Sequence, residues 1–236
     1  MLCGLFGKLP WKRDFIAIAA PRPFLHLWEP WLADCLVQAR ADLGDEAWRG
    51  AFRAAPIWHF HLRADARGAH HFGAFTPSMD AIGRYFPLTL VAEDEAASCE
   101  HPECETCQKW FDAAGDFLLT ILDGELSREA IEAGLARLRD FALSGDGAAE
   151  PTLADGLGFY DLDQAEAAAR PLETIFTAGR SRHATPAFGP NYWWTLGHDA
   201  YPPRAFVLHD AMPDARQFSA MLANRRAEAP RATPQP

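Results

Sequence analysis

Lysine is scarce in this sequence of 236 residues, which has only Lys8, Lys12 and Lys109. The chain has no cluster of basic residues, and its formal net charge at pH 7 is −10. An acidic chain is repelled by phosphate backbones and by anionic lipid, because the charges have the same sign. The composition therefore argues against a protein that binds nucleic acid.

Long apolar segments and a disulfide framework are also missing. The sequence has no run of about 18 apolar residues, the length that a membrane-spanning helix needs. Its first residues lack the charged and apolar regions of a signal peptide. The five cysteines are an odd number, which argues against an extracellular disulfide scaffold. We therefore expect a cytoplasmic protein that does not insert into a membrane.

Familiar catalytic motifs are missing as well. The sequence contains neither the Gly-x-Ser-x-Gly turn of many hydrolases nor the His-Glu-x-x-His pair of zinc proteases. The glycine segment at residues 4–10 (Gly-Leu-Phe-Gly-Lys-Leu-Pro) lacks the spacing of a phosphate-binding loop. We interpret it as a strand and turn whose glycines let another backbone approach closely. Contact with a ligand is the alternative.

The order of the predicted elements indicates an α/β protein. Alternating or apolar segments predict strands at 2–9, 57–63, 70–76, 86–92, 188–197 and 205–209. Apolar residues with helical spacing, and N-terminal capping residues, predict helices at 24–39, 110–122, 127–142, 161–170 and 214–222. We expect a single-domain layered sandwich, in which a mixed, largely antiparallel sheet is flanked by helices. This domain spans residues 1–226, and the polar, proline-rich residues 227–236 form a disordered tail.

The sharpest chemical signal is a group of four soft ligands within nine residues: Cys99, His101, Cys104 and Cys107. The Cys-x-x-Cys spacing of the last two lets a pair of thiolates hold one Zn²⁺. With the other two ligands they would complete a closed, structural zinc site. A redox-active cysteine pair and a solvated loop of free thiols are the alternatives. We expect no other cofactor.

Two histidines, His59 and His61, alternate along a predicted strand and therefore share one face. One interpretation gives them a metal-binding or catalytic role. The other is that they belong to a half-exposed face of the sheet. Asp80 and Arg84 are four residues apart and can form an ion pair if their turn is helical. Such a pair either clamps the turn or presents a polar edge to a partner.

Two adjacent tryptophans, Trp193 and Trp194, lie in a predicted strand. Neighbouring side chains of a strand point to opposite faces, so one of the two should point outward. An outward tryptophan is a candidate interface anchor, and we assign this role to Trp194. The alternative is that a helix covers this side chain.

Three segments, taken together, resemble the TagF family of accessory proteins of type VI secretion systems. They are residues 4–10 with Asp14-Phe15, residues 77–90 (Pro-Ser-Met-Asp, then Gly-Arg-Tyr-Phe-Pro-Leu-Thr-Leu), and residues 193–222 with Trp-Trp-Thr and a later Met-Pro. The likeness extends from about residue 3 to residue 222. Two features depart from it: Arg13 replaces the usual glycine, and the Cys99–Cys107 segment is not a feature of the family.

The resemblance implies a cytoplasmic, post-translational regulator of a type VI secretion system, a repressor and not an enzyme. Such a protein is expected to bind a forkhead-associated scaffold protein of the secretion machine. We expect the binding surface to include Lys8, Arg13, Asp14, Asp80, Arg84 and Trp194, and the sequence leaves a homodimer open. Two alternatives are a small metal- or thiol-dependent enzyme that uses the cysteine cluster, and a structural component of the secretion apparatus.

Overall fold

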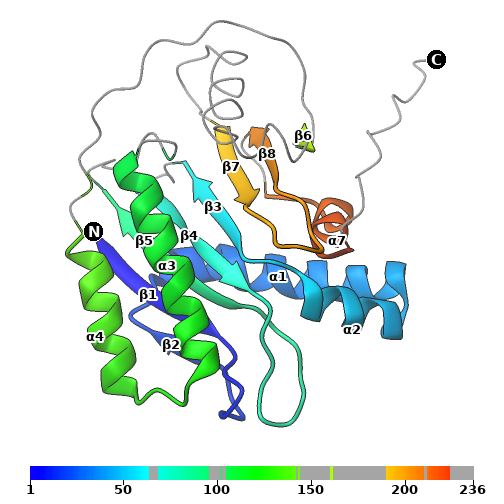
Figure 1. Ribbon diagram of the computed structural model, residues 1–236, viewed down its shortest axis with the longest axis horizontal. Coiled ribbons are helices and arrows are strands. Elements are labelled where there is room, and N and C mark those ends of the chain that lie inside the picture. Colours follow the sequence, from blue (N-terminus) through cyan, green and yellow to red (C-terminus); the bar gives the residue numbers. More distant parts are fainter. Residues whose placement is uncertain are drawn as a thin grey trace, which may run out of the picture.

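A computed structural model describes residues 1–63, 69–95, 102, 105–141, 143, 160–161, 190–209 and 212–223. These residues contain one eight-stranded sheet with the strand order β2-β1-β5-β4-β3-β7-β8-β6 (Figure 1). Each of these strand pairs is antiparallel. The strands are β1 (Leu2–Gly7), β2 (Ile16–Ile18), β3 (Trp58–Leu62), β4 (His70–Thr76), β5 (Leu88–Asp94), β6 (Tyr160–Asp161), β7 (Pro190–Thr195) and β8 (Arg204–His209).

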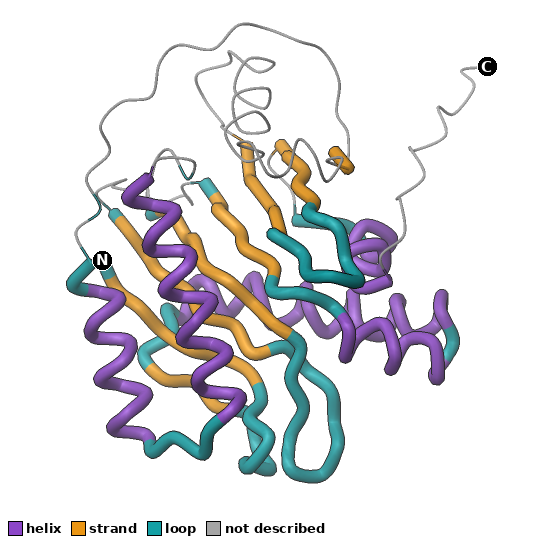
Figure 2. Tube along the Cα trace, viewed as in Figure 1, coloured by secondary structure: helices purple, strands orange, loops and turns teal. Residues whose placement is uncertain are grey.

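Helices cover both faces of this sheet (Figure 2). They are α1 (Arg22–Leu43), α2 (Asp45–Ala54), α3 (Glu105–Asp123), α4 (Arg128–Arg139) and α7 (Ala215–Ala223). Helices α3 and α4 pack on one face, and α1, α2 and α7 pack on the other. The predicted α/β sandwich is therefore confirmed. No helix of the described residues has both the length and the apolar sequence needed to cross a membrane.

Adjacent residues of a strand supply two separate cores, because successive side chains point to opposite faces. Leu90 packs toward α3 and α4, whereas Val91 packs toward α1. Trp194 and Trp193 divide in the same way. Because both faces are covered, strands β3, β4 and β5 are buried along their whole length.

Two elements escaped the sequence analysis. Helix α2 buries Trp48 and Phe52, which are four residues apart, and the three-residue strand β2 pairs with β1 at the edge of the sheet. The predicted helix at 161–170 and the predicted tail at 227–236 lie outside the described residues, apart from position 161.

Candidate partner-binding surface

Two loops meet at one end of the sheet. The first joins β1 to β2 (residues 8–15) and the second joins β4 to β5 (residues 77–87), and we call them the paired loops. Both lie at the lower end of the molecule in Figure 1. They contain most of the first two segments on which the family resemblance rests, so segments far apart in the sequence form one unit.

Two glycines of β1 let other stretches of backbone approach closely, and Gly7 does so at the end of the second loop. Gly7 has a φ of +138°, and a Cβ added there would lie 2.2 Å from the carbonyl oxygen of Pro87. A Cβ on Gly4 would lie 2.4 Å from the Cα of Ala20. Neither position has room for a side chain, because the obstructing atoms are backbone. The interpretation of these glycines as points of close backbone approach is confirmed.

The carboxylate of Asp80 is the centre of the paired loops. Its Oδ2 accepts hydrogen bonds from Lys8 Nζ at 2.7 Å and from Arg84 Nε at 2.6 Å. Its Oδ1 accepts from the backbone N–H of Arg84 at 2.8 Å and from that of Ile82 at 3.1 Å. The side chains of Lys8 and Asp80 are buried, so water screens their ion pair weakly.

These contacts keep Asp80 ionised. Burial by itself raises the pKa of a carboxyl group, because it disfavours the charged form. The donors from Lys8, Arg84 and the Ile82 backbone outweigh burial and hold the pKa of Asp80 well below its usual range. Asp80 is therefore a fixed anion that organises the loop, and it is poorly suited to exchange protons near neutral pH.

The turn around Asp80 is not helical, although the predicted ion pair with Arg84 does form. The N–H of Gly83 donates to the carbonyl of Asp80 at 3.0 Å, and the N–H of Asp80 donates to the carbonyl of Arg84 at 3.0 Å. Gly83 has a φ of +83°, which a tight turn permits most easily for glycine. The ion pair therefore closes a tight turn, in which backbone donors also reach the carboxylate.

Further contacts join the two loops. Ser78 Oγ donates to the carbonyl of Lys8 at 2.7 Å, and the N–H of Ala81 donates to the carbonyl of Lys12 at 2.9 Å. The guanidinium of Arg84 donates to the carbonyl of Arg13. The ammonium of Lys8 also lies 4.9 Å from the centre of the Phe15 ring. The paired loops are thus held in one arrangement by polar contacts along their length.

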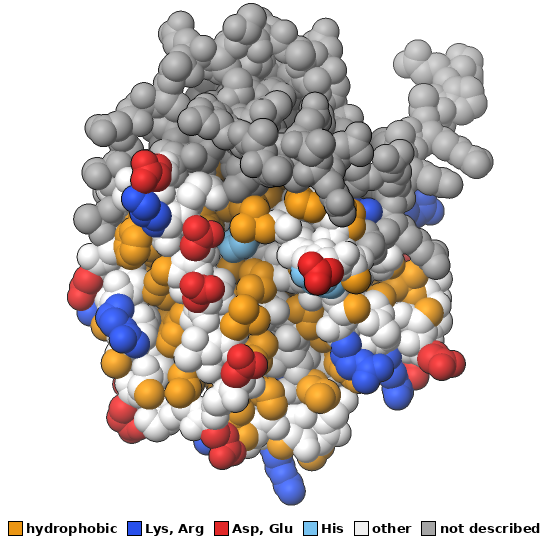
Figure 3. Space-filling view, viewed as in Figure 1, with side chains coloured by type: hydrophobic (Ala, Val, Ile, Leu, Met, Phe, Trp, Pro, Cys, Tyr) orange, Lys and Arg blue, Asp and Glu red, His pale blue; other side chains and the backbone are white. Residues whose placement is uncertain are grey.

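The outer surface of this unit is both apolar and basic. Met79 and Ile82 are 41% and 57% exposed, which is high for large apolar side chains. Arg84 keeps 54% of its side chain exposed while it holds Asp80. In Figure 3, apolar side chains and a projecting basic side chain appear at the lower end of the molecule, where the paired loops lie in Figure 1. The exposed large apolar and charged side chains of the two loops are Lys12, Arg13, Asp14, Phe15, Met79, Ile82 and Arg84.

Three residues predicted to contact a partner are buried instead. Lys8 and Asp80 face each other inside the paired loops, so they position this surface without belonging to it. Trp194 packs beneath α3, with its ring centre 4.6 Å from that of Phe111. The prediction of an outward tryptophan is wrong because a helix layer covers each face of the sheet. Arg13, Asp14 and Arg84 are exposed, and the apolar Met79 and Ile82 were missed.

The predicted zinc ligands Cys99, His101 and Cys104 lie outside the described residues. The fourth, Cys107, is buried in α3 among the apolar residues that face the sheet. The zinc site therefore stays a prediction. Within the described parts of the chain, no three His, Cys, Asp or Glu side chains gather as a metal site would require.

The face with His59 and His61 is buried, contrary to the half-exposed face that the sequence suggested. The ring of His59 stacks on Trp194 with 5.4 Å between ring centres. Burial lowers the pKa of His59 to about 4, because it disfavours the charged imidazolium. This histidine is therefore a neutral core residue at physiological pH.

Comparison with known protein families identifies the family to which the chain belongs. The family model "TagF N-terminal domain, Type VI secretion system-associated" matches residues 4–138, more than half of the chain. The chain belongs to the TagF family. This span of the TagF domain includes both paired loops, helices α1 to α3 and all but the last residue of α4, whereas β6, β7, β8 and α7 follow it. Membership links the chain to the type VI secretion system.

A solved structure shares the TagF fold seen here. The crystal structure of PA0076 from Pseudomonas aeruginosa PAO1 is similar with a TM-score of 0.63 and 21% sequence identity. The match covers 99% of this chain and 100% of that chain, so the common fold extends beyond the span of the family model. A comparison with curated protein sequences finds no match.

Proposed function

We propose that this TagF-family protein is a cytoplasmic regulator of a type VI secretion system, which represses it by binding a forkhead-associated scaffold protein. Binding takes place at the paired loops, through Met79, Ile82 and the basic side chains beside them. In this proposal the protein acts by association and not by catalysis. The observation that carries it is a rigid loop unit with an exposed surface that is both apolar and basic.

The chemistry of the paired loops supports a binding role. Large apolar side chains exposed beside cations are typical of protein interfaces, where arginine and methionine are enriched. The buried contacts of Asp80 hold the loops before a partner arrives, and such preorganisation reduces the entropy lost on binding. The charged groups inside the loops are already paired with one another, which supports a structural use of these groups.

The test is a binding measurement between the purified protein and the forkhead-associated protein of the same secretion system. The variant Met79→Asp/Ile82→Asp places two anions on the proposed surface. We expect it to keep its thermal stability, because both side chains are exposed, and to bind at least about tenfold more weakly. The matched control is Val37→Asp on α1, where the native side chain is 71% exposed. We expect this control to bind like the wild type.

A secretion assay in cells separates regulation from a structural role. Overproduction of the wild-type protein should reduce secretion, and the Met79→Asp/Ile82→Asp variant should have lost most of that effect. If the wild type does not bind the scaffold protein at micromolar concentrations, the proposed partner is wrong. If deletion of the protein abolishes secretion, the molecule is a component of the apparatus and not a repressor.

A further inference from the structure

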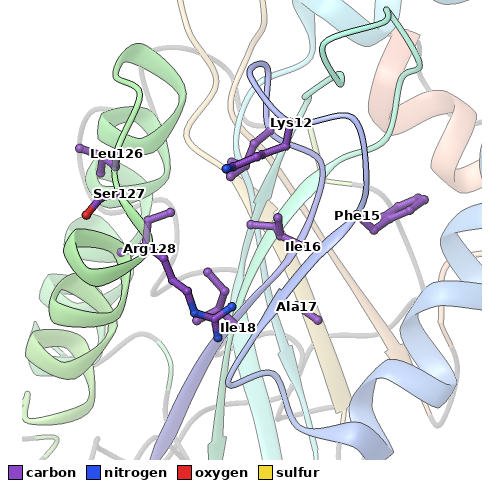
Figure 4. Close-up of a pocket in the computed structure, with 10 residues that line it drawn as sticks. Lys12, Phe15, Ile16, Ala17, Ile18, Leu126, Ser127 and Arg128 are labelled. Carbon is purple, nitrogen blue, oxygen red and sulfur yellow. The ribbon is translucent and has the colours of Figure 1, made fainter.

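A groove lies beside the paired loops, between the edge strand β2 and the start of α4. Its volume is about 360 Å³, and its walls are mainly apolar. Figure 4 shows the side chains of Lys12 and Ile16 pointing into it from the β1–β2 segment, and that of Arg128 entering from α4. The side chains of Phe15 and Ala17 point away from it. The groove lining also includes Leu9, Ile18, Leu126, Ser127 and Ile131.

Strand β2 offers this groove an open backbone edge. It is the last strand on its side of the described sheet and pairs with β1 alone, through residues 16–18. An edge strand directs the N–H and C=O groups of alternate residues away from its neighbour, where another strand can accept them. A peptide that adds to such an edge gains main-chain hydrogen bonds, and pockets for alternate side chains make the binding selective. The groove beside β2 would supply such a pocket.

The charges of the groove select the kind of peptide. Its two charged lining residues, Lys12 and Arg128, are both cations in a protein with a net charge of −10. Arg128 Nε donates to Glu132 Oε1 at 2.8 Å, and Figure 4 shows the Arg128 side chain extending from α4 on the groove side. Among the described residues, no carboxylate lies within ion-pair distance of the Lys12 ammonium. The N-terminus of α4 adds partial positive charge on the same side.

We infer that the groove binds an extended, acidic segment of the partner protein by strand addition to β2. Side chains at alternate positions of this segment share one face and enter the groove. Apolar ones among them meet its apolar lining, and acidic ones reach Lys12 and Arg128. A second copy of the chain fits less well, because pairing of two β2 edges would bring the same cations together. The identity of the partner rests on the proposed function, whereas the chemistry of the bound segment does not.

The experiment uses a capped seven-residue peptide with Glu at its second and sixth positions, Val at its fourth and Thr at the odd positions, so that the acids and the valine share one face. It is added to the isotopically labelled full-length protein. We expect shifts of the backbone amide signals of residues 16–18 and saturable binding. A peptide with Lys in place of the acids should bind at least about tenfold more weakly, since it meets two cations. Absence of amide shifts, or equal binding of the two peptides, would overturn the inference.

Backbone methylation tests strand addition itself. In an extended peptide the N–H groups of the even positions point to one edge, and those of the odd positions point to the other. N-methylation of the even positions and N-methylation of the odd positions should therefore have unequal effects, because only one edge pairs with β2. Equal affinity of the two methylated peptides would contradict strand addition.

Charge reversal identifies the cations. The variant Lys12→Glu/Arg128→Glu should bind the acidic peptide at least about tenfold more weakly and keep its fold, because Glu suits the first turn of a helix. The control Lys109→Glu changes an exposed cation on α3, outside the groove, and should bind within about twofold of the wild type. A dimer that dissociates when Lys12 and Arg128 are reversed would instead identify a second copy as the occupant.

The two proposals can fail separately. The peptide titration needs no scaffold protein, so a failed scaffold interaction leaves the groove inference standing if the peptide binds. Conversely, the groove inference fails by itself if the wild type binds the scaffold protein but not the acidic peptide, while Met79→Asp/Ile82→Asp fails to bind the scaffold protein. That result would support the paired-loop surface and reject the groove.

Discussion

The substitution Gly7→Ala tests whether the close approach of two backbones holds the paired loops together. The new Cβ would lie 2.2 Å from the carbonyl oxygen of Pro87 and 2.9 Å from the Cα of Leu88, and both are backbone atoms. Ordinary contact for a Cβ begins at 3.4 Å, so the two segments must separate by roughly 1 Å. The φ of +138° adds strain, because L-residues rarely adopt it.

The expected loss of stability combines these two effects. Backbone strain of this kind costs about 1–3 kcal/mol, and forced overpacking costs about 1–3 kcal/mol more. We expect Gly7→Ala to lower the free energy of unfolding by about 3 kcal/mol or more. For a chain of this size that corresponds to a fall of about 6–12 °C in the melting temperature. Binding of the scaffold protein should weaken as well, since the surface depends on the same packing.

Two glycines serve as matched controls. A Cβ on Gly83 meets nothing within 4 Å but has a φ of +83°, so Gly83→Ala isolates backbone strain of about 1–3 kcal/mol. A Cβ on Gly50 also meets nothing and lies in α2, where alanine should stabilise the helix by about 0.5–1 kcal/mol. Urea unfolding followed by tryptophan fluorescence ranks the three variants. If Gly7→Ala is no more destabilising than Gly83→Ala, the close approach at Pro87 is wrong.

Two further predictions concern pH. The pKa of Asp80 in the folded protein lies below that of an unfolded aspartate, so the ionised carboxylate stabilises the fold above about pH 4 and this stabilisation is lost on acidification. The free energy of unfolding should therefore fall less steeply below about pH 4 in Asp80→Asn than in the wild type. An unchanged slope would argue against the ion pairs of Asp80. The pKa of His59 is about 4 in the folded protein and about 6.5 in the unfolded chain, so between these pH values only the unfolded chain binds the proton. The free energy of unfolding of the wild type should therefore fall by up to ~3 kcal/mol from pH 6.5 to pH 4. His59→Phe should reduce that loss, whereas His26→Gln, at an exposed position on α1, should not.

Local patterns predicted several elements well, because the contacts that form these elements join residues that are close in the sequence. The stripe of α1 is buried at Trp28, Leu32 and four further positions, as helical spacing requires. Ser127 Oγ accepts a hydrogen bond from the N–H of Ala130 and so caps the N-terminus of α4. Asp214 and Gln217 have the spacing of a capping box, and they form a reciprocal cap of α7 in which the side chain of each accepts from the backbone N–H of the other.

Exposure was predicted poorly, because it depends on layers that a single strand does not reveal. Alternation in β7 correctly indicates that Trp193 and Trp194 face opposite sides, yet helices cover both. Lys8 has the charge of a surface residue, but Asp80, which neutralises it, is 72 positions away. Burial of an ion pair needs both partners in place, and their meeting follows from the tertiary fold.

The sequence by itself determined the α/β class, most helices and strands, the close approach at the glycine segment and the resemblance to the TagF family, because these depend on local spacing and on motifs. Only the tertiary structure decided what those motifs build. The contacts among Lys8, Asp80 and Arg84 join two loops at one end of the sheet, and the groove beside them exists because β2 ends that sheet near the start of α4. Such features arise from pairing between distant segments, which no local pattern encodes.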